Sequence, residues 1–210
     1  MPMTVRAVVF DVGGVLTSSP FDAFARYERE RGLPDGFLRT VNATDADTNA
    51  WARLERREID LDDFAELFGR EAAALGHPVD GRDVLGLLSG DLRPAMVEAV
   101  RRCAARLSTA LLTNNFVVDP SMERADLAEV YGIVDVVLES SKLGVRKPDP
   151  RIYELTCQVL DVEPADVVFL DDLGVNLKPA RALGMHTIKV TDPDAALEAL
   201  AEAVGFPVSG

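Results

Sequence analysis

Acidic, hydroxyl, amide and lysine side chains stand just after apolar segments at several places in the chain. Asp11 follows the first such segment, Thr113-Asn114 the second and Asp171-Asp172 the fourth, while Lys147 lies shortly after the third. Carboxylate oxygens suit Mg²⁺, a carboxylate can act as a nucleophile, and hydroxyl, amide and ammonium groups donate to phosphate oxygens. These residue types predict phosphoryl transfer, provided that the fold brings them together.

Five short apolar runs rich in β-branched residues are predicted to be strands that position these side chains. Their apolar residues are consecutive rather than alternating, which is typical of a parallel sheet covered on both faces. In such sheets functional groups gather at the carboxyl ends of the strands, so we expect the candidate residues at one edge. The predicted strands are residues 5–10, 109–112, 134–138, 167–170 and 187–190.

Helical patterns alternate with the last four of these strands. Several have an aspartate before a proline at the start and a glycine at the end, which are the usual signals of helix termini. This alternation predicts an α/β fold, a doubly wound Rossmann-like parallel sheet. The predicted helices are residues 93–107, 120–131 (with Asp119 as N-cap), 150–160, 176–183 and 193–204.

The segment between the first two strands has no strand-like run and is predicted to be helical. One helix begins at Ser19-Pro20 and ends at Gly32, and another begins after Asp60 and ends at Gly76. We therefore expect an α-helical cap inserted after the first strand. The predicted domains are residues 1–16 with 91–210 as the core and residues 17–90 as the cap.

The composition is that of an acidic protein with enough apolar residues for a full core. Of 210 residues 48% are hydrophobic, and 22 Lys and Arg against 35 Asp and Glu give a net charge of −13. This charge argues against nucleic acid or an anionic membrane as a partner. The sequence has no apolar stretch of about 18 residues, and its N-terminal apolar run is too short for a signal peptide. With Cys103 and Cys157 as buried free thiols, we expect a soluble cytoplasmic protein.

Four segments resemble the motifs of the haloacid dehalogenase-like (HAD) hydrolase superfamily, subfamily IA. They are FDVGGVL (10–16), LLTNN (111–115), GVRKPDPRIYE (144–154) and FLDDLGVNLKPARALGM (169–185). Their order, spacing and position after strands agree over nearly the whole chain, and four motifs in register are a strong signal. The chain is most similar to the N-terminal phosphatase domain of soluble epoxide hydrolases. The helical insert matches the α-helical cap of that family.

The resemblance implies a nucleophile and a magnesium site in the first and last motifs. Asp11 would attack phosphorus and form an aspartyl-phosphate. It would bind Mg²⁺ together with the backbone carbonyl of Gly13 and the carboxylate of Asp172. Asp171 would support this site, and Asn176 is predicted to order the same loop by capping the helix that follows.

The two middle motifs imply the groups that hold the substrate. Thr113 and the N–H of Asn114 would bind the phosphate oxygens, and Lys147 would neutralise the nucleophile and the transferring phosphoryl group. The implied substrate is a small phosphorylated metabolite. We expect a monomer or a homodimer, because an amphipathic cap helix can pack either on the core or on a second subunit.

Gly13 departs from the family pattern. Phosphatases of this family usually have an aspartate there, which protonates the leaving group and then deprotonates the water that clears the intermediate. Glycine can do neither, and a positioned acid contributes about 10²–10⁴ in rate. We therefore expect low activity, a substrate with a good leaving group, or a replacement acid among Asp22, Asp45 and Asp47.

Two other functions stay open. A haloacid dehalogenase would use Asp11 to displace halide from carbon without a metal, although the pair Asp171-Asp172 argues against it. A non-catalytic phosphate-binding or regulatory protein would account for Gly13.

Among single residues, Lys142 is predicted to be solvated, and the two histidines, His77 and His186, lack the spacing of zinc ligands.

Overall fold

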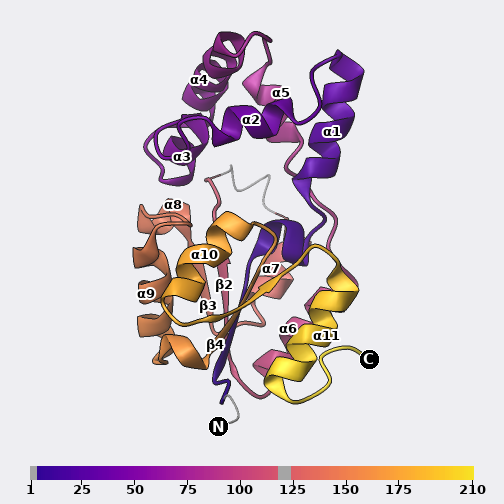
Figure 1. The fold of residues 1–210 in the computed structure, drawn as a ribbon, viewed down its shortest axis with the longest axis vertical. Coiled ribbons are helices and arrows are strands. Elements are labelled where there is room, and N and C mark those ends of the chain that lie inside the picture. Colours follow the sequence, from indigo (N-terminus) through magenta and orange to yellow (C-terminus); the bar gives the residue numbers. More distant parts are fainter. Residues whose placement is uncertain (1–3, 118–123) are drawn as a thin grey trace.

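A parallel sheet of five strands forms the centre of the computed structural model, which describes residues 4–117 and 124–210 (Figure 1). The strands are β1 (Ala7–Phe10), β2 (Ser108–Thr113), β3 (Val136–Glu139), β4 (Val167–Asp171) and β5 (His186–Lys189). Their order is β3-β2-β1-β4-β5, and every neighbouring pair is parallel. The predicted fold class is confirmed, and each predicted strand is present with its ends shifted by at most two residues.

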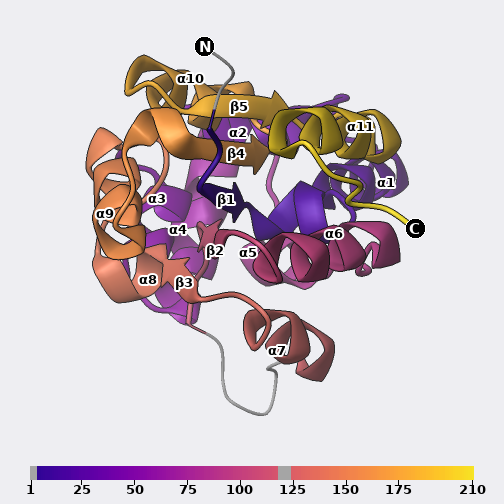
Figure 2. The same cartoon turned by 90° about the horizontal axis from the view of Figure 1, so that it is seen from below.

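Helices cover both faces of the sheet, which explains the consecutive apolar residues of the strands. Val8 and Phe10 of β1 point into one core with α6 (Pro94–Ala104), α7 (Ala125–Tyr131) and α11 (Pro193–Val204). Ala7 and Val9 point into a second core with α9 (Pro150–Leu160) and α10 (Gly174–Ala182). The view along the sheet shows these two layers (Figure 2). The other elements of the core are α8 (Ser140–Leu143) and the single turn η3 (Pro164–Asp166).

Helix ends with clear capping signals were predicted best. Helices α9 and α11 have the predicted bounds, and Asp149 and Asp192 accept backbone N–H groups as their N-caps. Helix α6 is shorter than predicted, because residues 105–107 turn the chain into β2. The predicted start of the next helix, Asp119-Pro120, lies outside the described residues, and the described helix begins at Ala125.

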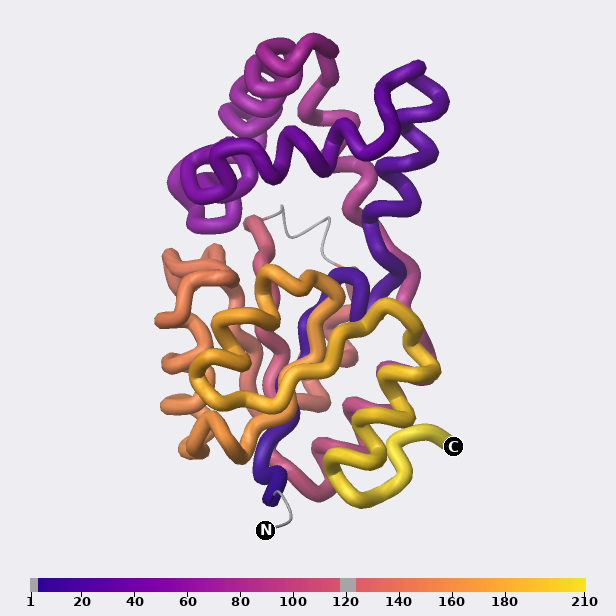
Figure 3. Tube along the Cα trace, in the orientation of Figure 1, coloured from indigo at the N-terminus to yellow at the C-terminus, as the bar shows by residue number. Residues whose placement is uncertain are grey.

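Most of the chain between β1 and α6 folds into helices that lie beyond the carboxyl ends of the strands (Figures 1 and 3). This segment, residues 17–90, is called the cap below. Trp51, Phe64 and Phe68 form the centre of its own apolar core, with 4.6 Å between the ring centroids of Trp51 and Phe64. The cap helices are α1 (Pro20–Arg31), α2 (Phe37–Ala43), α3 (Ala50–Glu55), α4 (Leu61–Ala74) and α5 (Gly81–Gly86).

Two connections run side by side between the cap and the core. Thr17 and Leu92 form an antiparallel bridge, and the N–H of Ser18 donates to the carbonyl of Asp91 (2.8 Å). The two chains approach so closely at Gly90 that a Cβ there would lie 2.4 Å from the Ser18 carbonyl oxygen. Glycine at this position therefore allows the two connections to pair.

The cysteines agree with the prediction, since Cys103 and Cys157 are free and buried. In the part of the chain that the structure describes, no helix is long and apolar enough to span a bilayer.

Candidate active site

Asp11 stands at the carboxyl end of the central strand and is only 7% exposed. Its carboxylate Oδ1 accepts the N–H of Val12 (2.7 Å), and the chain then continues through the wide turn η1 (Val12–Leu16). Gly14 in this turn has a φ of +75°, and a Cβ there would lie 2.3 Å from Oδ2 of Asp172. Glycine at position 14 therefore lets Asp172 lie against the turn that follows Asp11.

Lys147 joins the carboxyl ends of β1 and β4. Its Nζ lies 2.9 Å from Oδ1 of Asp11 and 2.7 Å from Oδ2 of Asp171, and its side chain is 1% exposed. The side chain of Asn114 fixes the Lys147 backbone, because Nδ2 donates to its carbonyl and Oδ1 accepts its N–H, each at 2.9 Å. Burial disfavours the charged ammonium, but Asp11 and Asp171 outweigh this effect and raise the pKa of Lys147. Lys147 is therefore a fixed positive charge beside Asp11.

Asp171 is the most thoroughly bonded carboxylate of the site. It is fully buried, and besides Lys147 its oxygens accept the N–H of Leu173 (2.8 Å) and the Nδ2 of Asn176 (3.1 Å to each oxygen). These bonds hold the carboxylate in one orientation at the start of α10.

Two predictions about single residues are settled by these contacts. The capping role predicted for Asn176 is wrong, because α10 begins at Gly174 and Asn176 lies inside it, where its amide binds Asp171 instead. Lys142 is solvated as predicted: its side chain is 71% exposed and pairs with Glu139.

Three carboxylates share this site with one lysine. Burial, followed by the negative charge of Asp171, raises the pKa of Asp172 to about 6. Burial also raises the pKa of Asp11 well above its ordinary value, against the opposing effect of Lys147. Oxygens of Asp11, Asp171 and Asp172 lie within 4.8 Å of one another. Such a compact excess of buried negative charge, presented by hard oxygen ligands, fits a divalent cation such as Mg²⁺.

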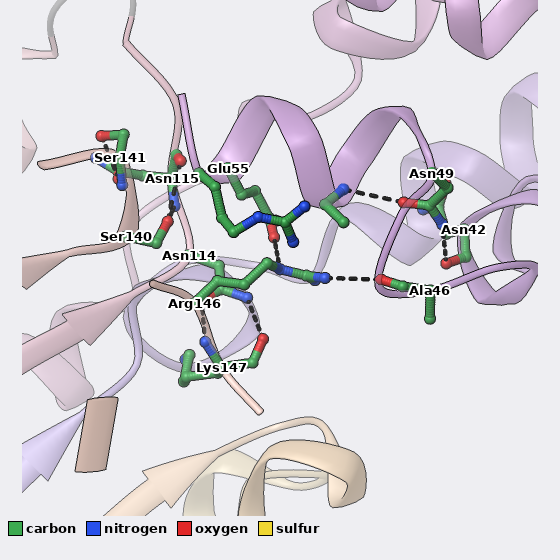
Figure 4. Close-up of polar contacts among 12 residues, drawn as sticks. Asn42, Ala46, Asn49, Glu55, Asn114, Asn115, Ser140, Ser141, Arg146 and Lys147 are labelled. Carbon is green, nitrogen blue, oxygen red and sulfur yellow. Dashed lines mark hydrogen bonds and ion pairs between the residues drawn. The ribbon is translucent and has the colours of Figure 1, made fainter. Parts of the chain in front are cut away.

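The loop after β2 is held by the first turn of α8. Thr113 ends the strand and is 5% exposed. The N–H of Asn115 donates to Oγ of Ser140 (3.0 Å), and its Oδ1 accepts the hydroxyl of Ser141 (2.9 Å) (Figure 4). The Nδ2 of Asn115 also donates to Oε1 of Glu139 (2.6 Å). Sequence reasoning assigned these contacts no role. Their only signal was that Glu139-Ser140-Ser141 directly follows the third predicted strand.

The comparison with family models agrees with this geometry. Residues 5–184 match the model of the haloacid dehalogenase-like hydrolases. The chain belongs to this family of hydrolases. This chain is 33% identical over 206 residues to a phosphatase of Mycobacterium tuberculosis, and the match covers 90% of this chain and 88% of the phosphatase. It is also 35% identical to the bifunctional epoxide hydrolase 2 of Sus scrofa, covering 97% of this chain and 39% of the relative. The chain thus spans only 19% to 40% of the length of four longer relatives that it matches, this epoxide hydrolase among them.

Solved HAD structures share the fold of this hydrolase. An enzyme of Bacteroides thetaiotaomicron in complex with magnesium and inorganic phosphate superposes with a TM-score of 0.59 at 18% identity, covering 88% of this chain and 93% of that one. The L-2-haloacid dehalogenase of Xanthobacter autotrophicus, with chloropropionic acid covalently bound, has a TM-score of 0.62 at 24% identity and covers 99% and 85%. The proteins similar to this chain thus include a phosphatase and a dehalogenase by name.

The position of the missing family acid is open in this HAD hydrolase. Gly13 is exposed with a φ of −67°, and a Cβ there would meet no atom within 4 Å. The three acids considered as replacements, Asp22, Asp45 and Asp47, are all exposed in the cap.

A different acid of the cap lies against the core. Glu55 at the end of α3 has a side chain that is 14% exposed, and its Oε2 lies 2.5 Å from Nε of Arg146. Burial raises the pKa of Glu55 above its ordinary value, against the opposing effects of Arg146 and Lys147. Sequence reasoning missed this pair, because nothing in the sequence signals that two residues 91 positions apart meet.

Proposed function

We propose that this HAD hydrolase is a Mg²⁺-dependent phosphatase of small phosphomonoesters that uses Asp11 as a covalent nucleophile. The observation that carries the proposal is the charge balance of the site: three clustered carboxylates face one buried lysine. A divalent cation would offset the negative charge that Lys147 leaves uncompensated, whereas displacement of halide from carbon needs no metal.

The side chains of this chain would divide the work of two displacements. In the first, a carboxylate oxygen of Asp11 bonds to phosphorus while the bond from phosphorus to the leaving oxygen breaks. In the second, water attacks the phosphorus of the aspartyl-phosphate, which releases inorganic phosphate and restores Asp11. The hydroxyl of Thr113 and the N–H of Asn114 would hold the phosphoryl oxygens, and Lys147 would offset charge on Asp11 and on the transferred group.

Asp11, Asp172 and the carbonyl of Gly13 would hold the metal, with Asp171 supporting them through its own hydrogen bonds. Bound Mg²⁺ would neutralise charge on the phosphoryl oxygens and the carboxylates. We further propose that residues 17–90 act as a cap that selects the substrate from the side of the strand ends.

Gly13 limits which substrates suit such a site. Without an acid at this position, the leaving oxygen departs without a positioned proton donor. Acyl, aryl and anomeric sugar phosphates need least protonation, so we propose these classes as the best substrates.

A screen of phosphorylated compounds with Mg²⁺ or with EDTA tests the proposal. We expect phosphate release from acetyl phosphate and p-nitrophenyl phosphate with Mg²⁺ and none with EDTA. Halide release from 2-chloropropionate that persists in EDTA would instead identify a dehalogenase. Stabilisation by phosphate with Mg²⁺, without turnover of any compound, would identify the non-catalytic alternative, for which Gly13 is the supporting observation.

A further inference from the structure

Arg146 reaches out of the core and binds the cap at two points. Its guanidinium donates through NH1 to the carbonyl of Ala46 (2.9 Å), and its Nε lies 2.5 Å from Oε2 of Glu55 (Figure 4). Ala46 lies in the turn before α3 and Glu55 is the last residue of α3, so one side chain contacts this part of the cap on both sides of the helix.

The base of Arg146 is fixed to the proposed catalytic machinery. Its chain neighbour is Lys147, whose backbone N–H and carbonyl are both bound by the side chain of Asn114. The Nζ of the same lysine contacts Asp11 and Asp171. The position of the Arg146 side chain and the position of Lys147 therefore depend on each other through the backbone that they share.

The contact lies on the side of the molecule away from the two connections. Helix α3 lies against α8 on the left of Figure 1, whereas the paired connections at Thr17 and Leu92 run on the right. A contact on the side opposite the connections would resist rotation of the cap about them.

The energetics suit a contact that opens and closes. The side chains of Arg146 and Glu55 are 19% and 14% exposed, so both charges lose most of their water when the cap lies on the core. Desolvation offsets much of the attraction within such a pair, and opening the cap returns water to both charges. The pair therefore favours one alignment of the cap surface on the core surface, and it adds only a small free-energy cost to their separation.

We propose that Arg146 is a positioning residue that couples closure of the cap to the placement of Lys147. The cap contact with Glu55 and Ala46 holds the 144–149 segment, and through it the ammonium beside Asp11, in its working position. This inference rests on the proposed function for its catalytic consequence, but the cap contact itself can be tested without turnover.

The single tryptophan of the chain reports directly on the cap. Trp51 lies in α3, is 8% exposed, and has its ring centroid 6.5 Å from that of Phe116, which follows the proposed phosphate loop in the core. Opening of the cap separates these rings and admits water, so acrylamide quenching and the emission wavelength of Trp51 measure closure.

The test compares Arg146→Gln, Arg146→Lys, Glu55→Gln and the double variant Glu55→Gln/Arg146→Gln with wild type. In the metal-free protein, we expect Arg146→Gln to increase quenching of Trp51 and shift its emission to the red. With p-nitrophenyl phosphate and Mg²⁺, we expect kcat to fall about 10- to 100-fold with a smaller change in KM, because a displaced Lys147 affects the chemical step. Arg146→Lys should restore part of both properties, and the double variant should be no worse than Arg146→Gln alone.

Arg151→Gln is the matched control. This arginine follows the same segment, is 75% exposed and pairs with Asp149 rather than with the cap. Its loss should change neither quenching nor kcat.

Two results would overturn the proposal. One is that Arg146→Gln has the same quenching of Trp51 and the same kcat as wild type. The other is a loss in Glu55→Gln that grows with the pKa of the leaving group and is not reproduced by Arg146→Gln, which would make Glu55 a proton donor instead. If wild type turns over no phosphate ester, the proposed function fails, whereas the quenching comparison still decides whether Arg146 holds the cap.

Discussion

Asp11 has both a fixed orientation and an immediate counter-charge. Its Oδ1 is held by the N–H of Val12 and by Lys147, and its surroundings contain two further carboxylates. An amide at this position would keep the shape and a hydrogen-bonding oxygen but could not form the acyl phosphate.

We therefore expect Asp11→Asn to lower turnover by at least about 10³-fold, as removal of a nucleophile does in other covalent enzymes, with the fold intact. Steady-state phosphate release and a thermal melt measure the two properties. A variant that folds and retains more than a small fraction of the activity would exclude Asp11 as the nucleophile.

Gly13 offers a gain-of-function prediction. Its backbone has ordinary torsions and open space where a Cβ would stand, so an aspartate is accommodated there. Gly13→Asp should raise turnover of alkyl phosphates by up to about 10²–10⁴-fold, and by less for acyl phosphates, for which the new carboxylate would assist only the deprotonation of the attacking water.

The neighbouring glycine is the control for this prediction. Gly14→Ala would place a Cβ against the carboxylate of Asp172 at a positive φ, and it should weaken both stability and metal binding. Equal rates of Gly13→Asp and wild type on every substrate would show that the leaving group is not limited by the acid missing at this position.

Several residues of the site could be predicted because they end strands. Asp11, Thr113 and Asp171 follow apolar runs, and parallel pairing brings such positions to one edge. The hydrogen bond from Asn176 to Asp171 could not be predicted in this way, because it depends on how α10 packs against the end of β4 and not on a local capping pattern.

At the scale of elements, the segment before α9 depends on β2 for its position. Asn114 makes two hydrogen bonds to the backbone of Lys147, and no regular secondary structure holds that residue. We expect Asn114→Ala to lower stability by about 1–3 kcal/mol and to reduce kcat beyond what the loss of folded protein explains.

Denaturant unfolding and kcat at saturating substrate separate the two effects. Thr156→Val is a suitable control, since it removes the buried hydroxyl of α9 that donates to the Ile152 carbonyl (2.7 Å) without touching Lys147. Equal loss of activity in both variants at equal stability would contradict a positioning role for Asn114.

Helix length decided which elements could be predicted. The longer helices α1 and α4 begin after Ser19 and Asp60, whose side chains accept backbone N–H groups, and their periodic apolar faces were recognisable. Helices α2, α3 and α5 have only six or seven residues, too few for a clear period of 3.6. Helix α3 was the important omission, because it carries both Trp51 and Glu55.

At the scale of the whole molecule, the acidic cluster connects stability with pH and metal binding. The carboxyl of Asp172 has its folded-state pKa raised to about 6, above its ordinary value of 3.8. A carboxyl with a raised pKa contributes stability that is fully present below about pH 4 and is lost as the pH rises through 6. Burial raises the pKa of Asp11 in the same direction. Ionisation of Asp11 and Asp172 therefore lowers the free energy of unfolding of the metal-free protein at neutral and alkaline pH.

Mg²⁺ should offset this loss of stability, and more strongly at high pH, because a protonated carboxyl must lose its proton before it binds metal. At 100 times its Kd, Mg²⁺ should raise the Tm by about 5–10 °C at pH 8, from about 2.7 kcal/mol of linkage, and by clearly less at pH 5. Asp172→Asn should melt higher than metal-free wild type at pH 8 and should lose most of the response. Melting curves with Mg²⁺, and with NaCl at equal ionic strength, measure these differences. A response to Mg²⁺ that is equal at pH 5 and pH 8, or that survives in Asp172→Asn, would place the metal away from these carboxylates.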